Sequence, residues 1–509
     1  MNLIASTSTF SFFTLISRML GYVRDILIAI FLGTSIFADA FFVAFRLPNT
    51  FRRLFAEGTF NAAFIPSYAG ALAKNKIEAD NFAKNVFNLL FIILLFFVLL
   101  AEIFMPQLIF LIAPGFYSDP EKFKLAVDLS RITFPFLFFI CLASFFGAIL
   151  NSYNKFAIAS AAPIILNIVL IASLFFSRWF NISDVVTLSY AVSLAGFLQL
   201  IILLFFVRKN FQPILSIRIK LNKQIRFFFK KLLPSIFSSG VTQINILVGT
   251  IIASFQAGAV SYLYYADRVY QINLAVAGIA VGTVMLPELS RHIKNKSVHK
   301  INNLQNRALE LCLFLSLPAA LALIIASDAI ITSLFGYGSF NQESVINTSI
   351  ALIFFAFGVP AFSILKIFSN LFFARNDTKT PFYLSAISVS LNIIISVSFF
   401  REFGFIIIPI ATSISSWVNV ILYYYFIKKR DLHNFDSKFF YKFPRMILST
   451  VVMGIILYLL LAFFSDKFVY NESWKFIYLF IIVLPSLISY FLISNFSGAF
   501  KFKDIKLKQ

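Results

Sequence analysis

Long apolar runs alternate with short polar connections along the whole chain of 509 residues. Each run is about 20 residues long, the length that an α-helix needs to cross the hydrocarbon core of a bilayer. A segment in lipid must satisfy its backbone hydrogen bonds internally, so the runs predict helices and not open strands. The pattern predicts about fourteen transmembrane helices, near residues 10–32, 36–56, 84–112, 129–151, 157–177, 185–207, 232–256, 262–288, 307–335, 345–373, 381–400, 404–427, 446–465 and 474–495.

Composition supports an all-α, polytopic membrane protein. Hydrophobic residues make up 60% of the chain, and the mean hydropathy is +0.88, more apolar than a soluble domain can bury. No basic residue precedes the first run, so we do not expect a cleavable signal peptide. Cys141 and Cys312 lie far apart in apolar runs and predict neither a disulfide framework nor a metal motif. The histidines all lie in polar connections and are poor candidates for a metal site or a catalytic base: His292, His299 and His433.

Basic residues are distributed unevenly between the connections. When a basic residue at the first or second position of a run is counted with the connection before it, the connections after even-numbered runs, with the C-terminal tail, hold 29 of the 43 Lys and Arg residues. Those after odd-numbered runs hold 6, and the interior of the runs holds 8. The positive-inside rule therefore predicts that both termini are cytoplasmic. The net charge of +21 then indicates anchoring to anionic lipid. Nucleic-acid binding is the weaker interpretation, because these residues follow the topology and form no single docking face.

Four landmarks recur in the same order after a shift of 221 to 225 residues: an arginine, a proline and two asparagines. An even number of helices in each copy gives both copies the same orientation across the membrane. The repeat therefore predicts two six-helix lobes related by a pseudo-two-fold axis, with a substrate cavity between them. The landmark pairs are Arg46 and Arg268, Pro66 and Pro287, Asn154 and Asn376, and Asn167 and Asn392.

The repeat also predicts the domain boundaries. We expect an N-terminal lobe with a basic linker at 1–231 and a second lobe with its linker at 232–445. The range 446–509 then holds two further transmembrane helices and a basic tail.

Charged residues lie inside the predicted spans, where each would cost about 2.5–3.5 kcal/mol at the centre of a lipid-facing helix. The stretch "SRMLGYVRD" (17–25) places two arginines and an aspartate near the middle of the first run. Such residues face protein or water and are functional candidates by default. Seven of the eight basic residues are arginine, whose fork binds phosphate and carboxylate, so the cavity is expected to take an anionic substrate. The eight are Arg18, Arg24, Arg46, Arg52, Arg53, Arg131, Arg268 and Lys366.

A purely structural interpretation stays open for individual charges. Arg18 and Asp25 are seven residues apart and share one helix face, and Asp267 adjoins Arg268, so such pairs could only hold helices together. Three charges near the cytoplasmic end of the second run could reach the interface at little cost: Arg52, Arg53 and Glu57.

The stretches "SRMLGYVRD", "ADAFFVAFRLPN", "RRLFAEGTFNAAFIP" and "YYADR" closely resemble the MurJ (MviN) family of lipid II flippases. That family belongs to the MOP superfamily, which also contains the MATE multidrug exporters. The resemblance implies a V-shaped pair of six-helix lobes, with two terminal helices that line a groove for the lipid tail. It also implies transport of undecaprenyl-pyrophosphate-linked disaccharide-pentapeptide from the cytoplasmic to the periplasmic leaflet of the inner membrane, for peptidoglycan synthesis.

The resemblance further implies the site residues. The substrate-binding positions of the family match Arg18, Arg24, Asp25, Asp39, Arg52 and Arg268. Support for this site is expected from Arg46, Arg53, Glu57 and Asp267. We expect alternating access, no catalysis, no cofactor and no metal. The expected partners are lipid II, membrane lipids and the cell-wall synthesis machinery, without nucleic acid.

Three other classes of function compete with the flippase. A MATE-like exporter of cationic drugs should line its cavity with carboxylates, yet the first two runs hold five arginines against three acidic residues. An enzyme acting on polyprenyl lipids would need clustered carboxylates or a positioned base, and the acidic residues here are scattered. For a structural scaffold, buried charge would be a liability. The balance of charge favours the flippase over the exporter.

Overall fold

A computed structural model describes residues 3–55, 59–216 and 243–500, together with Arg226, Phe228 and Lys230. Every regular element in these ranges is a helix, which confirms the all-α prediction. The chain divides by its internal contacts into two compact units, Met1–Ser261 and Tyr262–Gln509. The predicted boundary between 231 and 232 falls outside the described residues and stays a prediction.

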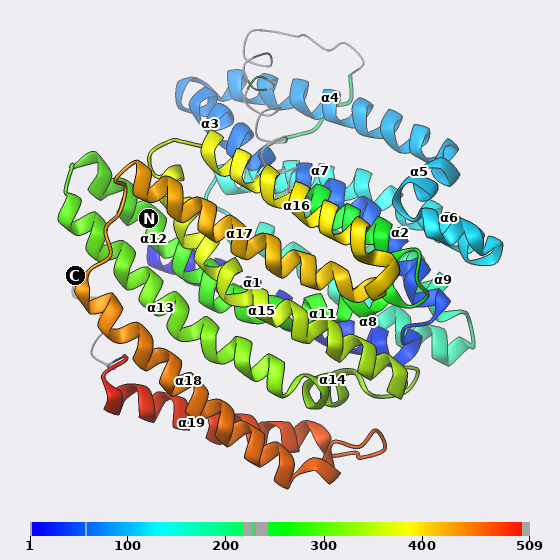
Figure 1. Ribbon diagram of the computed structural model, residues 1–509. Coiled ribbons are helices and arrows are strands. Elements are labelled where there is room, and N and C mark those ends of the chain that lie inside the picture. Colours follow the sequence, from blue (N-terminus) through cyan, green and yellow to red (C-terminus); the bar gives the residue numbers. More distant parts are fainter. Residues whose placement is uncertain are drawn as a thin grey trace. The chain divides into compact units, whose positions relative to one another are not determined.

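The first unit follows the order of the predicted runs, with extra short helices between them (Figure 1). Its elements are α1 (Leu3–Leu32), α2 (Ile36–Phe55), α3 (Thr59–Lys74), α4 (Lys76–Ile103), α5 (Met105–Ile112), the 3₁₀ turn η1 (Pro114–Ser118), α6 (Pro120–Thr133), α7 (Pro135–Ser152), α8 (Phe156–Phe180), α9 (Asp184–Val207) and a helix at Gln243–Ala253.

The second unit begins within α11 (Ala259–Leu274). Its further elements are the π-helical stretch η2 (Ala275–Ala280), α12 (Val281–Lys294), α13 (Val298–Ile325), α14 (Ser327–Phe335), α15 (Gln342–Phe373), α16 (Lys379–Phe403), the 3₁₀ turn η3 (Gly404–Ile406), α17 (Ile407–Lys429), α18 (Ser437–Phe463), the 3₁₀ turn η4 (Ser465–Lys467) and α19 (Lys475–Ser497).

Within the described residues, nine segments are long and apolar enough to cross a membrane. They cover ten of the predicted runs, because the segment Lys379–Lys429 joins two of them. The other four runs correspond to α1, to α2, to the helix Gln243–Ala253 and to α11 with α12. These include the runs that carry Arg24, Asp39 and Arg268. The protein is therefore multi-pass, and the total of fourteen spans stays a prediction.

Several predicted runs are interrupted in the structure. The run 84–112 is two helices, α4 and α5, which meet at Phe104, because Pro106 in the first turn of α5 has no N–H to continue the ladder. The run 307–335 is also two helices, α13 and α14, which meet at Ala326 without a proline in the first turn of α14. The helix α3, between the second and third runs, was not predicted.

Turn geometry recurs at the offset of the internal repeat. Asp119 and Asn341, 222 residues apart, each cap the next helix by accepting a hydrogen bond from the backbone N–H three residues later. Asn154 and Asn376 both adopt the left-handed conformation, with φ of 62° and 59°, between a pair of long helices. The local backbone therefore supports the repeat that the sequence predicted.

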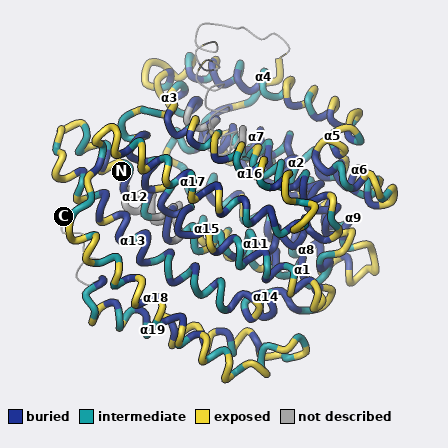
Figure 2. Tube along the Cα trace, in the orientation of Figure 1, coloured by how far each residue is buried: buried dark blue, intermediate teal, exposed yellow. Residues whose placement is uncertain are grey.

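Helix packing within each unit also follows the internal repeat. In the first unit α9 packs against α7 and α8, and α4 packs against α7. In the second unit α17 packs against α15 and α16, and α13 packs against α15. The long helix α15 is largely buried, whereas α19 is largely exposed (Figure 2). The exposed apolar side chains of α19 are suited to contact with lipid.

The C-terminal helices α18 and α19 pack against each other, and α18 packs against α13 (Figure 1). Three polar contacts at different heights hold this pair to the rest of the second unit. They are Lys442 Nζ to Glu310 Oε2 at 2.7 Å, the Tyr490 hydroxyl to the Phe314 carbonyl at 2.6 Å, and Lys475 Nζ to the Gly336 carbonyl at 2.5 Å.

Candidate functional site

The charges of the first run form a buried cluster between α1 and α8. Arg24 and Asp25 are 7% and 3% exposed. The Nε and Nη2 atoms of Arg24 both donate to Asp25 Oδ1, at 3.0 and 2.6 Å. Arg24 Nη1 donates to Asn167 Oδ1 of α8 at 2.9 Å. The cluster is therefore a charge-assisted pair with a neutral amide as its third member.

Asp25 thus pairs with the neighbouring Arg24, although adjacent positions lie about 100° apart around a helix. The long arginine side chain bends back to reach the carboxylate. Arg18, which shares a helix face with Asp25, has an exposed side chain.

The arginines of the second run have other partners. Arg46 Nη1 donates to the hydroxyl of Thr250, on the helix Gln243–Ala253. Arg52 Nε donates to Asn49 Oδ1 within α2 at 2.9 Å, and Arg53 is half-buried. Glu57 lies outside the described residues.

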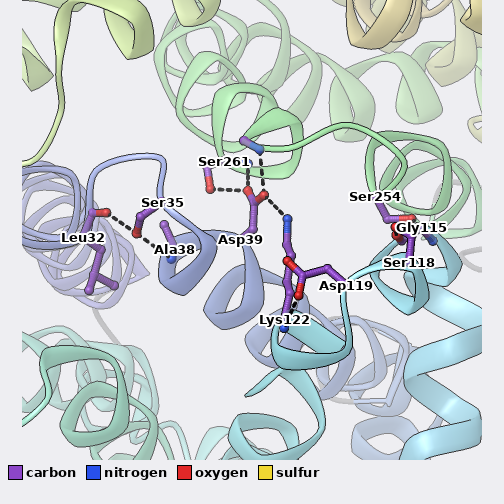
Figure 3. Close-up of polar contacts among 11 residues, drawn as sticks. Leu32, Ser35, Ala38, Asp39, Gly115, Ser118, Asp119, Lys122, Ser254 and Ser261 are labelled. Atoms are coloured by element: carbon purple, nitrogen blue, oxygen red, sulfur yellow. Dashed lines mark hydrogen bonds and ion pairs between the residues drawn. The ribbon is translucent and has the colours of Figure 1, made fainter. Parts of the chain in front are cut away.

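Asp39, in the first turn of α2, occupies a second site (Figure 3). Its side chain is fully buried. Oδ2 accepts from Lys122 Nζ at 2.7 Å and from the backbone N–H of Gly258 at 2.9 Å. Oδ1 accepts from the backbone N–H and the hydroxyl of Ser261, at 3.0 and 2.6 Å. Asp39 therefore supplies the acceptor that the N–H of Ser261, in the first turn of α11, lacks within its own helix.

Lys122 completes the electrostatics of this site. It is 5% exposed, and its ammonium lies 4.1 Å from the centre of the Phe116 ring. Burial of both ions would be costly without the short ion pair and the further donors around the carboxylate. With two donors on each carboxylate oxygen, Asp39 is fully engaged in this arrangement.

A close backbone contact lies beside the Asp39 site (Figure 3). The N–H of Gly115, in η1, donates to the Ser254 hydroxyl at 3.0 Å. A Cβ atom at Gly115 would lie only 2.4 Å from the backbone N of Phe255 and from the carbonyl C and O of Ser254. Glycine is required here for space.

The predicted charges of the second unit lie on α11. Arg268 Nη2 donates to the Tyr264 hydroxyl at 2.9 Å, and the guanidinium lies 4.7 Å from the centre of the Tyr264 ring. Asp267 accepts from the side chain of Gln271. Both residues are half-buried.

An apolar cavity of about 320 Å³ lies in the second unit, between α13, α15, α17 and α18. Two polar side chains line it, and both donate to backbone carbonyls. The Thr450 hydroxyl donates to the Met446 carbonyl within α18, and Trp417 Nε1 of α17 donates to the Phe357 carbonyl of α15. The lining of this cavity is therefore almost entirely apolar. Among the residues lining it are Leu317, Ala320, Leu321, Ala356 and Pro360.

Sequence reasoning missed the roles of three residues in these sites. In the sequence, Lys122 is one basic residue of a polar connection, Asn167 is a repeat landmark and Ser261 lies in a short connection, and the local pattern around each indicates no partner. One signal was present for Ser261, because it follows Asp39 by 222 residues, the offset of the repeat. Across the described part of the chain, no group of three or more His, Cys, Asp or Glu side chains could hold a metal ion.

Comparisons with known proteins indicate one family over most of the chain. The family model "Lipid II flippase MurJ" matches residues 28–498. The probable lipid II flippase MurJ of Rhizobium meliloti (strain 1021) is 40% identical over 90% of this chain and 86% of its own length. The corresponding protein of Rickettsia prowazekii (strain Madrid E) is 37% identical over 93% of each chain.

Solved structures support the same relationship. A structure of the lipid II flippase MurJ in an inward closed conformation has a TM-score of 0.82 and 31% identity, and the match covers 96% of this chain and 98% of that one. An inward-facing MATE family transporter of the MOP superfamily has a TM-score of 0.67 at 17% identity, over 81% of this chain and 94% of that one. The second match shows a shared fold.

Proposed function

Because the chain belongs to the MurJ family of lipid II flippases, we propose that it moves lipid II from the cytoplasmic to the periplasmic leaflet of the bacterial inner membrane. The observation that carries this proposal is the buried pair of Arg24 and Asp25 in α1. A charge at this depth in an apolar helix is costly and therefore indicates a functional site.

Lipid II presents a pyrophosphate and peptide carboxylates on a head group that cannot cross hydrocarbon unaided. Arg24 can replace part of the lost hydration of these anions with charge-assisted hydrogen bonds. Asp25 keeps the empty site nearly neutral, so that the arginine can be buried before the substrate arrives. We propose further contacts from Arg18, Arg52 and Arg268.

The Asp39 site suits a different role from direct contact with the head group. All four of its hydrogen bonds are made to protein groups, and an anionic substrate would be repelled by its carboxylate. We therefore propose that Asp39 and Lys122 hold the segment 254–261 against α2 and η1, and so close the transport path on one side. Alternating access would require this set of contacts to open.

The lipid tail needs an apolar path beside the polar one. The cavity between α13, α15, α17 and α18 is lined by hydrocarbon and is bordered by one of the two C-terminal helices. We propose that α18 and α19 form the wall of a groove for the polyprenyl tail, as the range 446–509 was predicted to do. Both termini would lie in the cytoplasm.

The proposal is tested by measuring lipid II that is accessible on the outer face of cells that depend on this protein alone. We expect Arg24→Ala and Arg268→Ala to abolish exposure while the protein inserts at normal levels. Arg178→Ala is the matched control, because Arg178 is an exposed arginine near the end of α8. Normal exposure in both site variants would refute the arginine mechanism. Normal exposure after removal of the protein, with no other flippase present, would refute the function.

A further inference from the structure

Asn167 is the uncharged residue that joins the pair of Arg24 and Asp25 from α8, and it contacts α1 at two positions. Its Oδ1 accepts from Arg24 Nη1 at 2.9 Å, and its Nδ2 donates to the Ser17 carbonyl at 2.8 Å. The side chain is 5% exposed, so neither contact is made in competition with bulk solvent. One amide therefore joins two helices and orients one arginine.

The contacts of Arg24 determine which of its N–H groups can bind a ligand. A guanidinium has five N–H groups in a planar fork. Two of them point to Asp25 and one points to Asn167. This geometry fixes the plane of the fork, and the two further N–H groups on Nη1 and Nη2 can bond to oxygen atoms of an anion.

We propose that Asn167 is a positioning residue for the anionic head group, which holds the Arg24 guanidinium in place without adding charge to the site. The inference rests on the proposed transport of lipid II and adds a residue to its mechanism. An amide oxygen accepts the hydrogen bond as a carboxylate would, yet it leaves Asp25 as the single negative charge on Arg24. A second carboxylate would make the cluster net negative and would repel phosphate.

The repeat provides a comparison within the chain. Asn392 on α16 is the landmark that corresponds to Asn167. Its amide bonds to the hydroxyls of Thr412 and Ser396, at 3.1 and 3.0 Å. A buried asparagine at this position thus serves helix packing in one copy of the repeat, while in the other copy it also binds an arginine.

Moving the carboxylate from position 25 to position 167 distinguishes a positioning role of Asn167 from a role in helix packing alone. We would measure lipid II binding to the purified full-length protein in detergent, with thermal melting as a check of folding. Asn167→Asp should weaken binding at least tenfold, because Arg24 would then lie between two carboxylates. Asp25→Asn should also weaken binding, because the Arg24 guanidinium then loses the ion pair that fixes the plane of its fork. The double variant Asp25→Asn with Asn167→Asp restores one carboxylate and one amide, and should bind more tightly than either single variant.

The results distinguish failure of the Asn167 inference from failure of the proposed lipid II transport. Wild-type affinity in Asn167→Asp would overturn the inference, and so would effects of the two substitutions that simply add. Asn392→Leu is the matched control for Asn167→Leu, since both remove a buried amide, and only Asn167→Leu should weaken lipid II binding. If the wild-type protein itself neither binds nor moves lipid II, the proposed function fails, whatever the variants do.

Discussion

The contact between η1 and the segment 254–261 can be tested with a single methyl group. Gly115→Ala places a Cβ atom 2.4 Å from backbone atoms of Ser254 and Phe255. Carbon atoms in good contact are separated by about 3.5–4.0 Å, so the two backbones must move apart by about 1 Å. No change of rotamer can relieve this clash, because both sides of the contact are backbone.

The magnitude follows from the cost of overpacking, which is typically about 1–3 kcal/mol. A penalty of about 2 kcal/mol on the closed arrangement alone lowers its population, relative to the open one, roughly 30-fold. Transport requires both arrangements, so lipid II exposure on the cell surface should fall. The protein should still insert, because the glycine lies in a short turn and not in a spanning helix.

The assay is a distance measurement between spin labels in the purified protein, in a background without the two native cysteines. Labels at the exposed positions Tyr117 and Ala257 report directly on this contact. Gly115→Ala should shift the distances to larger values. Gly70→Ala is the control, since a Cβ at Gly70 meets no atom within 4 Å. Unchanged distances together with unchanged transport in Gly115→Ala would refute the reasoning.

Three further predictions concern other parts of the molecule. Lys122→Met leaves the buried carboxylate of Asp39 without its counter-charge and should destabilise the closed arrangement by about 3–5 kcal/mol, seen as earlier thermal unfolding, whereas Lys124→Met at an exposed position should change little. Burial lowers the pKa of His433, in the connection before α18, from 6.5 to about 4. The imidazole of the unfolded chain then binds a proton more tightly than that of the folded chain. The contribution of His433 to the free energy of unfolding is therefore fully present above pH 6.5, and about 3 kcal/mol of it is lost as the pH drops towards 4. Thermal melts at pH 7.5 and 4.5 should show this loss in the wild type and not in His433→Leu. Ala320→Phe should fill the apolar cavity and weaken binding of lipid II more than binding of a short-chain analogue, and equal effects on the two ligands would contradict the tail groove.

Much of the fold could be predicted because lipid leaves the backbone few choices. Ten of the predicted runs fall on the nine segments of the described chain that are long and apolar enough to cross a membrane. Interruptions were harder, because a break in a helix depends on a few atoms and hardly changes hydropathy. Pro106 could have signalled the break at Phe104, but no comparable residue marks the break at Ala326.

The candidate site was predictable by residue type and not by partner. The cost of charge in an apolar run identified Arg24, Asp25 and Asp39. Lys122 of α6 lies 83 residues from Asp39, and Asn167 of α8 lies 143 residues from Arg24, so spacing within one helix could not reveal these partners. Spacing in fact suggested Arg18 for Asp25, whereas the flexible arginine next to it makes the ion pair.

The contacts that hold α18 and α19 also bear on how the protein is made. They join residues 132, 139 and 176 positions apart. At about 5–20 residues per second, α13 enters the membrane on the order of 10 s before α18 has been synthesised. During that interval the carboxylate of Glu310 has no Lys442 to pair with. The last helices to emerge from the ribosome thus complete a part of the protein that was inserted long before them.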